Sequence, residues 1–164
     1  MLPPLLREET IRIGFEAPNR EAALAEMVAL LPPCGLNARQ KGDLLELLLE
    51  RERFGTTGLG DGPALPHGIF PDLASPIAAL GISRKGIAFP SLDGAPVFLL
   101  FLLVLPESQE APEQKNLILH DAYVLFRDQF LRERLKIAET PEEVYEIILR
   151  ESGSQLLVAG SRKK

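Results

Sequence analysis

The sequence is poor in the residues that form disulfides, metal clusters and aromatic cages. Of its 164 residues one is cysteine, two are histidine, two are tyrosine and none is tryptophan. The single cysteine, Cys34, excludes an internal disulfide and a cysteine-based zinc site, because both need a second thiol. Such cysteine usage is typical of a reducing compartment, so we expect a cytoplasmic protein.

A membrane-spanning run and a basic charge balance are also missing. The longest apolar run, residues 95–105, is far shorter than the roughly 20 residues that cross a bilayer, and we interpret it as a buried strand. The N-terminus reaches acidic residues after a short apolar run, which is not typical of a secretory signal. The formal net charge of −5 argues against a nucleic-acid binder, which would need a basic face. We therefore predict neither membrane insertion nor nucleic-acid binding.

What the chain does contain is the pattern of one globular α/β domain. It is 46% hydrophobic and 25% charged. Asn19 begins one predicted helix, which the Pro-Pro-Cys-Gly run at 32–35 ends. Asn37 begins a second predicted helix, which Gly55 ends. Two helices ahead of a strand-rich middle predict helices packed on a sheet.

The middle of the chain predicts strands and the last third predicts helices. Apolar segments at 76–83 and 86–106 are separated by Arg84-Lys85-Gly86 and interrupted by Leu92-Asp93-Gly94, both typical of turns. From Pro112 onward the pattern is helical, with Thr140 as a cap in a capping box. The prediction is a single α/β domain, residues 1–152, whose mixed β-sheet is flanked by helices on both sides. Residues 153–164 are predicted to be a flexible tail.

The segment "TTGLGDGPALPHG", residues 56–68, is the most unusual stretch. Its glycines allow backbone N–H groups to converge into an anion-binding nest. It is not a Walker A motif, because no Gly-Lys-Ser/Thr follows, and Pro63 breaks the dinucleotide-binding pattern. An ordinary surface loop is the alternative interpretation.

His67 lies at the end of this predicted loop. A neutral imidazole can act as a nucleophile, a general base or a metal ligand. A metal site is disfavoured, since His120 is remote in sequence and no carboxylate cluster surrounds His67. A Ser-His-Asp triad stays open from the spacing, although no nucleophile-elbow motif is present. Arg51 and Arg53, with the hydroxyls of Thr56 and Thr57, could hold phosphoryl oxygens. Residue types alone favour phosphohistidine chemistry and a structural histidine equally.

The stretch "RERFGTTGLGDGPALPHG" resembles the signature of the fructose/mannitol-type EIIA domains of the bacterial phosphoenolpyruvate-dependent phosphotransferase system (PTS). The segment with Asp93-Gly94 resembles the strand pair of that family, and residues 125–149 resemble its C-terminal helices. The residues that match the signature without a gap are Arg51, Glu52, Thr57, Gly58, Gly60, Gly62, Ala64, Pro66, His67 and Gly68.

The resemblance implies a phosphocarrier. His67 would accept a phosphoryl group from the carrier protein HPr or a paralogue and form a tele-phosphohistidine. Arg51 would stabilise the phosphate, and Thr57, Gly58 and Gly68 would contact it. Neither a metal nor a cofactor is implied.

The chain departs from the family pattern at a second active-site position. The family usually has a second histidine there, at the start of the helix that follows the long buried strand, whereas this sequence has Lys115. His120 lies five residues later, a rotation of roughly 140° on a helix, so we expect it off the face of Lys115. We interpret His120 as a surface or packed histidine. A register shift that brings it into the site is the alternative.

Two subtypes share the signature. Nitrogen-type EIIA proteins regulate other proteins through their phosphorylation state, and "LLERERFGTTGLGDGPALPHG" resembles this variant more. Sugar-specific EIIA domains instead pass the phosphoryl group to a IIB domain of a permease. A third hypothesis is a protein-binding module with reduced or lost phosphotransfer, which Lys115 motivates.

Overall fold

A mixed β-sheet forms the centre of the molecule. The structure is a computed structural model that describes residues 3–32 and 36–161. The strands are β1 (Ile11–Ile13), β2 (Pro63–Ala64), β3 (His67–Phe70), β4 (Ile77–Ile87) and β5 (Val97–Pro106). Within the described ranges they form one five-stranded sheet in the order β1–β4–β5–β2, with β3 also paired to β5. Strand β4 is antiparallel to β5, and the other pairs are parallel.

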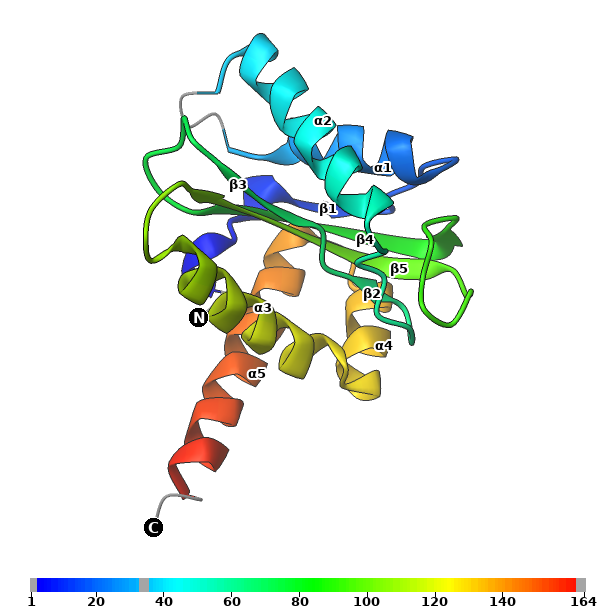
Figure 1. Cartoon of the computed structure of the whole chain (residues 1–164). Coiled ribbons are helices and arrows are strands. Elements are labelled where there is room, and N and C mark those ends of the chain that lie inside the picture. Colours follow the sequence, from blue (N-terminus) through cyan, green and yellow to red (C-terminus); the bar gives the residue numbers. More distant parts are fainter. Residues whose placement is uncertain (1–2, 33–35, 162–164) are drawn as a thin grey trace.

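Helices cover both faces of this sheet (Figure 1). On one face lie α1 (Arg20–Leu30) and α2 (Ala38–Arg53), and on the other lie α3 (Ala111–Phe126), α4 (Gln129–Ile137) and α5 (Pro141–Ser161). The 3-10 turns η1 (Pro3–Leu5) and η2 (Glu8–Thr10) precede β1. The predicted α/β class, with helices on both sides of a mixed sheet, is confirmed.

Strand β5 is buried on both faces, as its apolar run predicts. Phe101 and Leu103 belong to the core beneath α3, α4 and α5, whereas Leu100 and Leu102 belong to the core beneath α1 and α2. All four side chains are fully buried. A strand covered on both sides needs an apolar residue at every position, which explains why this run does not alternate.

Both predicted asparagine caps are confirmed. The side chain of Asn19 accepts a hydrogen bond from the N–H of Ala22 at 2.8 Å, where α1 begins. The side chain of Asn37 accepts from the N–H of Gln40 at 2.9 Å, and Gln40 accepts from the N–H of Asn37 at 2.8 Å. Helix α2 ends at Arg53, just before Gly55. Residues 33–35 of the predicted stop of α1 lie outside the described residues.

Residues 84–86, predicted to form a turn, lie inside β4 instead. The register between β4 and β5 shifts between Ile82 and Ile87, and Gly86 adopts a φ of +90° there. This is a β-bulge, which takes up extra residues without ending the strand, so the predicted turn is wrong. The turn at Asp93-Gly94 is confirmed, because Gly94 has a φ of +70° and its N–H donates to the carbonyl of Ser91 at 3.0 Å.

The segment 56–68 is not entirely the loop that its composition predicts. The predicted loop at 56–68 contains β2, and His67 and Gly68 already belong to β3. Pairing with β5 imposes this extended conformation on a segment whose composition favours turns. Helix α5 continues through the predicted flexible tail as far as Ser161, and its last turns extend away from the body of the molecule (Figure 1).

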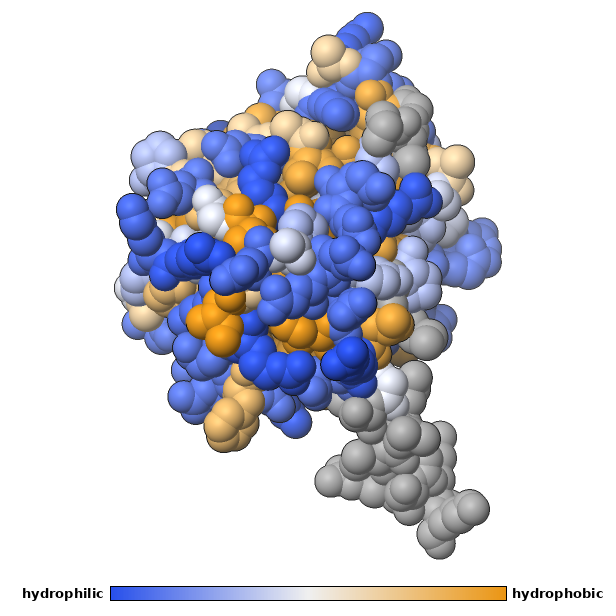
Figure 2. Space-filling model, turned by 180° about the vertical axis from the view of Figure 1, so that it is seen from behind, coloured by the Kyte–Doolittle hydropathy of each residue, from blue (hydrophilic) through white to orange (hydrophobic). Residues whose placement is uncertain are grey.

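Thr140 caps α5 as predicted, since its hydroxyl oxygen accepts from the N–H of Glu143 at 3.1 Å. The carboxylate of Glu143 accepts from the N–H of Glu139 at 3.0 Å, one residue earlier than a capping box requires. Figure 2 shows the molecule from behind, where hydrophilic residues cover most of the face and the apolar areas between them are small. In the part of the chain that the structure describes, no helix is long and apolar enough to cross a membrane.

Candidate functional site

His67 is the first residue of β3, not the end of a free loop. It stands opposite Leu103 of β5, and the N–H of Leu103 donates to the carbonyl of Pro66 at 3.0 Å. Its side chain is half-buried. The central strand therefore fixes the backbone on which the imidazole is mounted.

A backbone carbonyl determines which ring nitrogen of His67 carries the hydrogen. Nδ1 lies 2.8 Å from the carbonyl oxygen of Leu65. A carbonyl oxygen can only accept a hydrogen bond, so Nδ1 must be the donor. In the neutral ring the lone pair is then on Nε2, which is the nitrogen available for nucleophilic attack.

Burial and two neighbouring cations keep this ring neutral. The pKa of His67 is lowered chiefly because the ring is withdrawn from water, and the charges of Arg51 and Lys115 lower it further, against an opposing effect of the Leu65 hydrogen bond. A protonated imidazole has no free lone pair. The lowered pKa thus preserves the nucleophilic form at neutral pH and somewhat below it.

Two cavities flank His67, and Arg51 lines both of them. One has a volume of about 380 Å³ and is lined by Arg51, Thr56, Thr57, Leu59, Leu65, His67, Asn116, Leu119, His120 and Tyr123. The other has a volume of about 350 Å³ and is lined by Leu47, Glu50, Arg51, Phe54, His67, Gly68, Ile69 and Lys115. Arg51 lies in the last turn of α2, where its guanidinium donates to the carbonyl of Gly55 at 3.0 Å.

Helix α3 presents a basic or titratable side chain to each cavity. Lys115 is half-buried beside His67 in one cavity, and His120 is exposed at the rim of the other. The two residues line different cavities, as their expected separation around the helix predicts. The interpretation of His120 as a surface residue agrees with its exposure. It does not anticipate that His120 lines the same cavity as His67 without any shift of register.

Thr57 is buried and already committed to hydrogen bonds. Its hydroxyl donates to one carboxylate oxygen of Glu52, and its N–H donates to the other at 3.2 Å. The sequence identified Glu52 only as part of the matched signature. Its burial could be inferred only from the rotation of α2 about its axis. Because Arg51 faces the cavities, the next residue points about 100° away from them, toward the interior.

Two glycines of the predicted anion nest are required by close packing. A Cβ on Gly58 would lie 2.4 Å from the carbonyl oxygen of Pro90, and one on Gly68 would lie 2.7 Å from Leu47 Cδ2. The N–H of Gly58 donates to Thr56 Oγ1 at 3.0 Å. The five amides of residues 57–61 all donate within the protein. The amides of this stretch are already engaged, so a phosphate contact from Gly58 would require its hydrogen bond to be exchanged.

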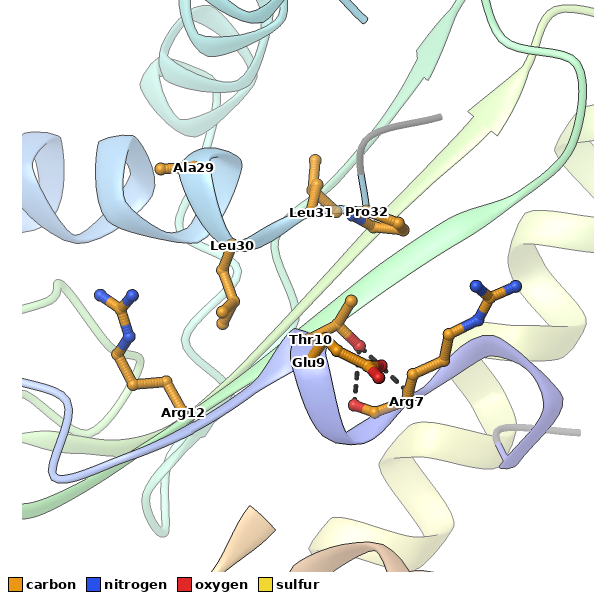
Figure 3. Close-up of a pocket in the computed structure, with 8 residues that line it drawn as sticks. All are labelled: Arg7, Glu9, Thr10, Arg12, Ala29, Leu30, Leu31 and Pro32. Atoms are coloured by element: carbon orange, nitrogen blue, oxygen red, sulfur yellow. Dashed lines mark hydrogen bonds between the residues drawn. The ribbon is translucent and has the colours of Figure 1, made fainter. Parts of the chain in front are cut away.

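A larger cavity, of about 540 Å³, lies elsewhere and includes none of the predicted site residues. Figure 3 shows Arg7 and Arg12 at its two ends, with Leu30 and Leu31 of the α1 end above β1. Across the described ranges, no group of three or more histidine, cysteine, aspartate or glutamate side chains is placed to hold a metal ion.

Comparison with known families agrees with this fold. The family described as "Phosphoenolpyruvate-dependent sugar phosphotransferase system, EIIA 2" matches residues 4–151. A nitrogen regulatory protein of Bradyrhizobium diazoefficiens is 32% identical over 144 residues, which cover 88% of this chain and 92% of the relative. The fructose-specific EIIABC component of Bacillus subtilis is 33% identical over 145 residues, which cover 88% of this chain but 22% of that larger protein.

Solved structures lead to the same family. The nitrogen regulatory protein IIA-Ntr of Neisseria meningitidis superposes with a TM-score of 0.79 at 28% identity, covering 90% of this chain and 98% of that chain. The mannitol IIA of Escherichia coli has a TM-score of 0.67 at 20% identity, covering 87% and 98%, and supports the fold alone. The chain therefore belongs to the EIIA type-2 family of the PTS, whose members are phosphotransfer components. Its relatives in that family include both nitrogen regulatory proteins and fructose-specific components.

Proposed function

We propose that His67 accepts a phosphoryl group on Nε2 from an HPr-type carrier, and that phosphorylation controls how this protein binds regulated partners. The observation that carries the proposal is the contact between Nδ1 of His67 and the Leu65 carbonyl. It leaves Nε2 as the nucleophile, in a site that also holds Arg51 and Lys115.

The proposed transfer moves no net proton. The Nε2 lone pair attacks the phosphorus of the phosphohistidine on the carrier, a P–N bond forms at Nε2, and the P–N bond of the carrier breaks. The electron pair of that bond remains on the nitrogen of the carrier. Each ring keeps the hydrogen on its other nitrogen, so no general base is required.

The positive charges of Arg51 and Lys115 favour the neutral ring before transfer and the phosphorylated ring after it. Before transfer, the positive charges of Arg51 and Lys115 disfavour a protonated ring and so lower its pKa. After transfer, the same charges stabilise the phosphoryl oxygens, with the planar fork of Arg51 able to bind two of them. We assign Lys115 the place that a second histidine usually occupies in the family. Contacts of Thr57, Gly58 and Gly68 with the phosphoryl group remain predictions from the resemblance.

The surroundings of His67 suit a regulatory switch. Large apolar side chains that line the two cavities are exposed: Phe54 is 85% exposed and Tyr123 43%. Such side chains are typical of protein-binding surfaces. Phosphorylation would add about −1.5 to −2 charges in their midst, which is enough to favour one partner over another.

The test is phosphorylation with phosphoenolpyruvate, Enzyme I and an HPr-type carrier. We expect a phosphoprotein that is labile in acid and stable in base, and that is absent from a folded His67→Ala variant. A wild-type protein that acquires no phosphate would contradict the carrier function and leave the protein-binding module as the alternative.

A second candidate function is the sugar-specific one, in which the protein passes the phosphoryl group to a IIB domain. The similarity to the fructose-specific component of Bacillus subtilis favours it. Mixing the phosphorylated protein with a IIB domain, its permease and sugar separates the two functions. Sugar phosphorylation would support the permease subunit, and a phosphoprotein that persists in the mixture would support the regulator.

A further inference from the structure

Glu52 is a buried carboxylate beside the site. Its side chain lies in the last turn of α2 and is 4% exposed. None of the salt bridges formed by the described residues includes it. A buried carboxylate is costly unless hydrogen bonds satisfy it, and packing alone would favour an apolar side chain of similar size. The position of this carboxylate therefore needs another explanation.

Both oxygens of Glu52 are occupied by one residue. The hydroxyl of Thr57 donates to Oε1, and the N–H of Thr57 donates to Oε2 at 3.2 Å. An ionised carboxylate can only accept, so it suits two donors on the same residue. This pair of bonds fixes the orientation of the Thr57 peptide relative to α2.

The orientation of Thr57 is passed on to His67 through two further hydrogen bonds. The N–H of Leu65 donates to the carbonyl of Thr57 at 3.1 Å. The carbonyl of Leu65 in turn accepts from Nδ1 of His67 at 2.8 Å. A continuous chain of bonds thus leads from the Glu52 carboxylate through Thr57 and Leu65 to the ring.

The same helical turn supplies Arg51. Consecutive residues of an α-helix point about 100° apart, so Arg51 faces the cavities while Glu52 faces inward. The end of α2 thereby carries both the cation that faces the site and the anion that holds the His67 segment. This arrangement connects the helical turn that carries Arg51 to the segment that carries the imidazole.

We propose that Glu52 is a positioning residue, whose carboxylate holds Thr57 and thereby keeps the Leu65 carbonyl on Nδ1 of His67. The inference rests on the proposed function, in that a hydrogen on Nδ1 is what leaves Nε2 ready for phosphorylation. Glu52 itself touches neither the ring nor the incoming phosphoryl group. Its effect on transfer passes entirely through the tautomer and orientation of the imidazole.

Glu52→Gln tests this with little change of shape. A glutamine can keep both contacts only by accepting from the Thr57 N–H with its oxygen and donating from its NH₂ group to the Thr57 hydroxyl. Both bonds then lose the charged acceptor, which makes them weaker. In ¹⁵N-labelled protein at a pH where His67 is neutral, long-range ¹H–¹⁵N spectra report which ring nitrogen carries the hydrogen. We expect the Nδ1–H form in the wild type and a mixture of the two tautomers in Glu52→Gln. Glu46→Gln, the same change at an exposed position of α2, should keep the wild-type spectrum.

Transfer from the phosphorylated carrier gives a second measurement. Because misplacement of a nucleophile by about 1 Å lowers rates by up to about a hundredfold, we expect the maximal rate in Glu52→Gln to fall at least about tenfold. The KM for the carrier should stay unchanged, since the docking surface is intact. Thr57→Val, which keeps the N–H bond and removes the hydroxyl bond, should shift the tautomers in the same direction but less.

The outcomes separate this inference from the proposed function. If folded Glu52→Gln and Thr57→Val both keep the Nδ1–H tautomer, the positioning role is wrong, whatever the transfer rate. If the wild type is not phosphorylated at all, the proposed function fails, while the tautomer spectra still decide whether Glu52 positions the ring. Should Glu52→Gln fail to fold, an unchanged tautomer in Thr57→Val overturns the inference on its own.

Discussion

Two properties of His67, its pKa and its tautomer, are set by different neighbouring residues. Lys115 and Arg51 both lower the pKa of His67, and neither contributes to the bond that fixes its tautomer. Charge and orientation therefore come from different residues. A substitution can change one property and leave the other.

Replacing Lys115 with methionine should raise the pKa of His67 toward its ordinary value, because one repelling cation is lost while burial is kept. The expected consequence is that the acid limb of phosphoryl acceptance moves to higher pH. An NMR titration of the His67 Cε1–H signal measures the pKa directly. Lys85→Met, which removes a cation that is 83% exposed on β4, is the control and should leave the pKa of His67 unchanged. An unchanged pKa in Lys115→Met would contradict the assigned role of Lys115.

The lowered pKa of His67 also affects the stability of the fold. The unfolded chain binds this proton more readily than the folded one, so the free energy of unfolding rises with pH between the folded and unfolded pKa values. The stability gained from the neutral His67 ring is complete above about pH 6.5, the ordinary pKa of histidine. It is lost as the pH falls toward the folded pKa. Urea unfolding across this range should show that the free energy of unfolding changes over a narrower pH interval in Lys115→Met than in the wild type. The reason is that the folded and unfolded pKa values of His67 lie closer together in the variant.

At the scale of elements, the segment 56–62 is fastened to the β4–β5 connection. The carboxylate of Asp93 accepts from the N–H of Asp61 at 2.9 Å, from the N–H of Ala95 and from Ser91 Oγ, both at 3.0 Å. These bonds, led by that from Asp61, lower the pKa of the Asp93 carboxyl. The sequence predicts the turn at Asp93-Gly94, but the fastening depends on a partner 32 residues away.

Asp93→Asn should loosen this fastening, because an amide has one acceptor oxygen in place of two. We expect faster hydrogen exchange at the N–H of Asp61, measured by NMR. Asp43→Asn, on the exposed face of α2, should leave that exchange rate as it is. Equal protection of the Asp61 N–H in wild type and Asp93→Asn would contradict the fastening.

Gly58 packs tightly against the backbone of Pro90 and Ser91. Gly58→Ala would press a Cβ against the Pro90 carbonyl, so we expect the free energy of unfolding to fall by about 1–3 kcal/mol in urea denaturation. Gly42→Ala, in α2, where a Cβ meets nothing within 4 Å, should instead raise it by up to about 1 kcal/mol. A loss at Gly42 or none at Gly58 would contradict the packing described here.

Local sequence signals predicted some elements and missed others for a physical reason. Asn19, Asn37 and Thr140 cap helices through bonds to residues three positions away, so the sequence alone contains both partners. Strands β2 and β3 form because they pair with β5. Strand β4 continues past Gly86 because a register shift in its pairing with β5 takes up the extra residues. Those conformations depend on a partner strand that local composition does not reveal.

At the scale of the whole molecule, α2, β3 and α3 converge on one site. The signature predicted His67 and Arg51, and Lys115, where the sequence departs from the family pattern, lines a cavity with both of them. The sequence does not reveal that His120 lines a cavity with His67 or that Glu52 is buried. Both depend on how α2 and α3 are rotated against the sheet.

The exposed apolar side chains around the site should serve docking rather than chemistry. Phe54→Ser should raise the KM for the phosphorylated carrier about tenfold, corresponding to about 1.4 kcal/mol, without changing the pKa or tautomer of His67. Phe130→Ser is the matched control, since Phe130 on α4 is 83% exposed and lines neither cavity. A KM change of equal size in both variants would contradict a docking surface centred on His67.

The proposed phosphoryl acceptor is Nε2 of His67, and this assignment can be measured. Long-range ¹H–¹⁵N spectra of ¹⁵N-labelled protein, recorded before and after phosphorylation by the carrier, test it most directly. We expect a new phosphorus coupling at Nε2 of His67, with the hydrogen retained on Nδ1 and His120 unmodified. Phosphorylation of Nδ1, or of His120 in place of His67, would contradict it.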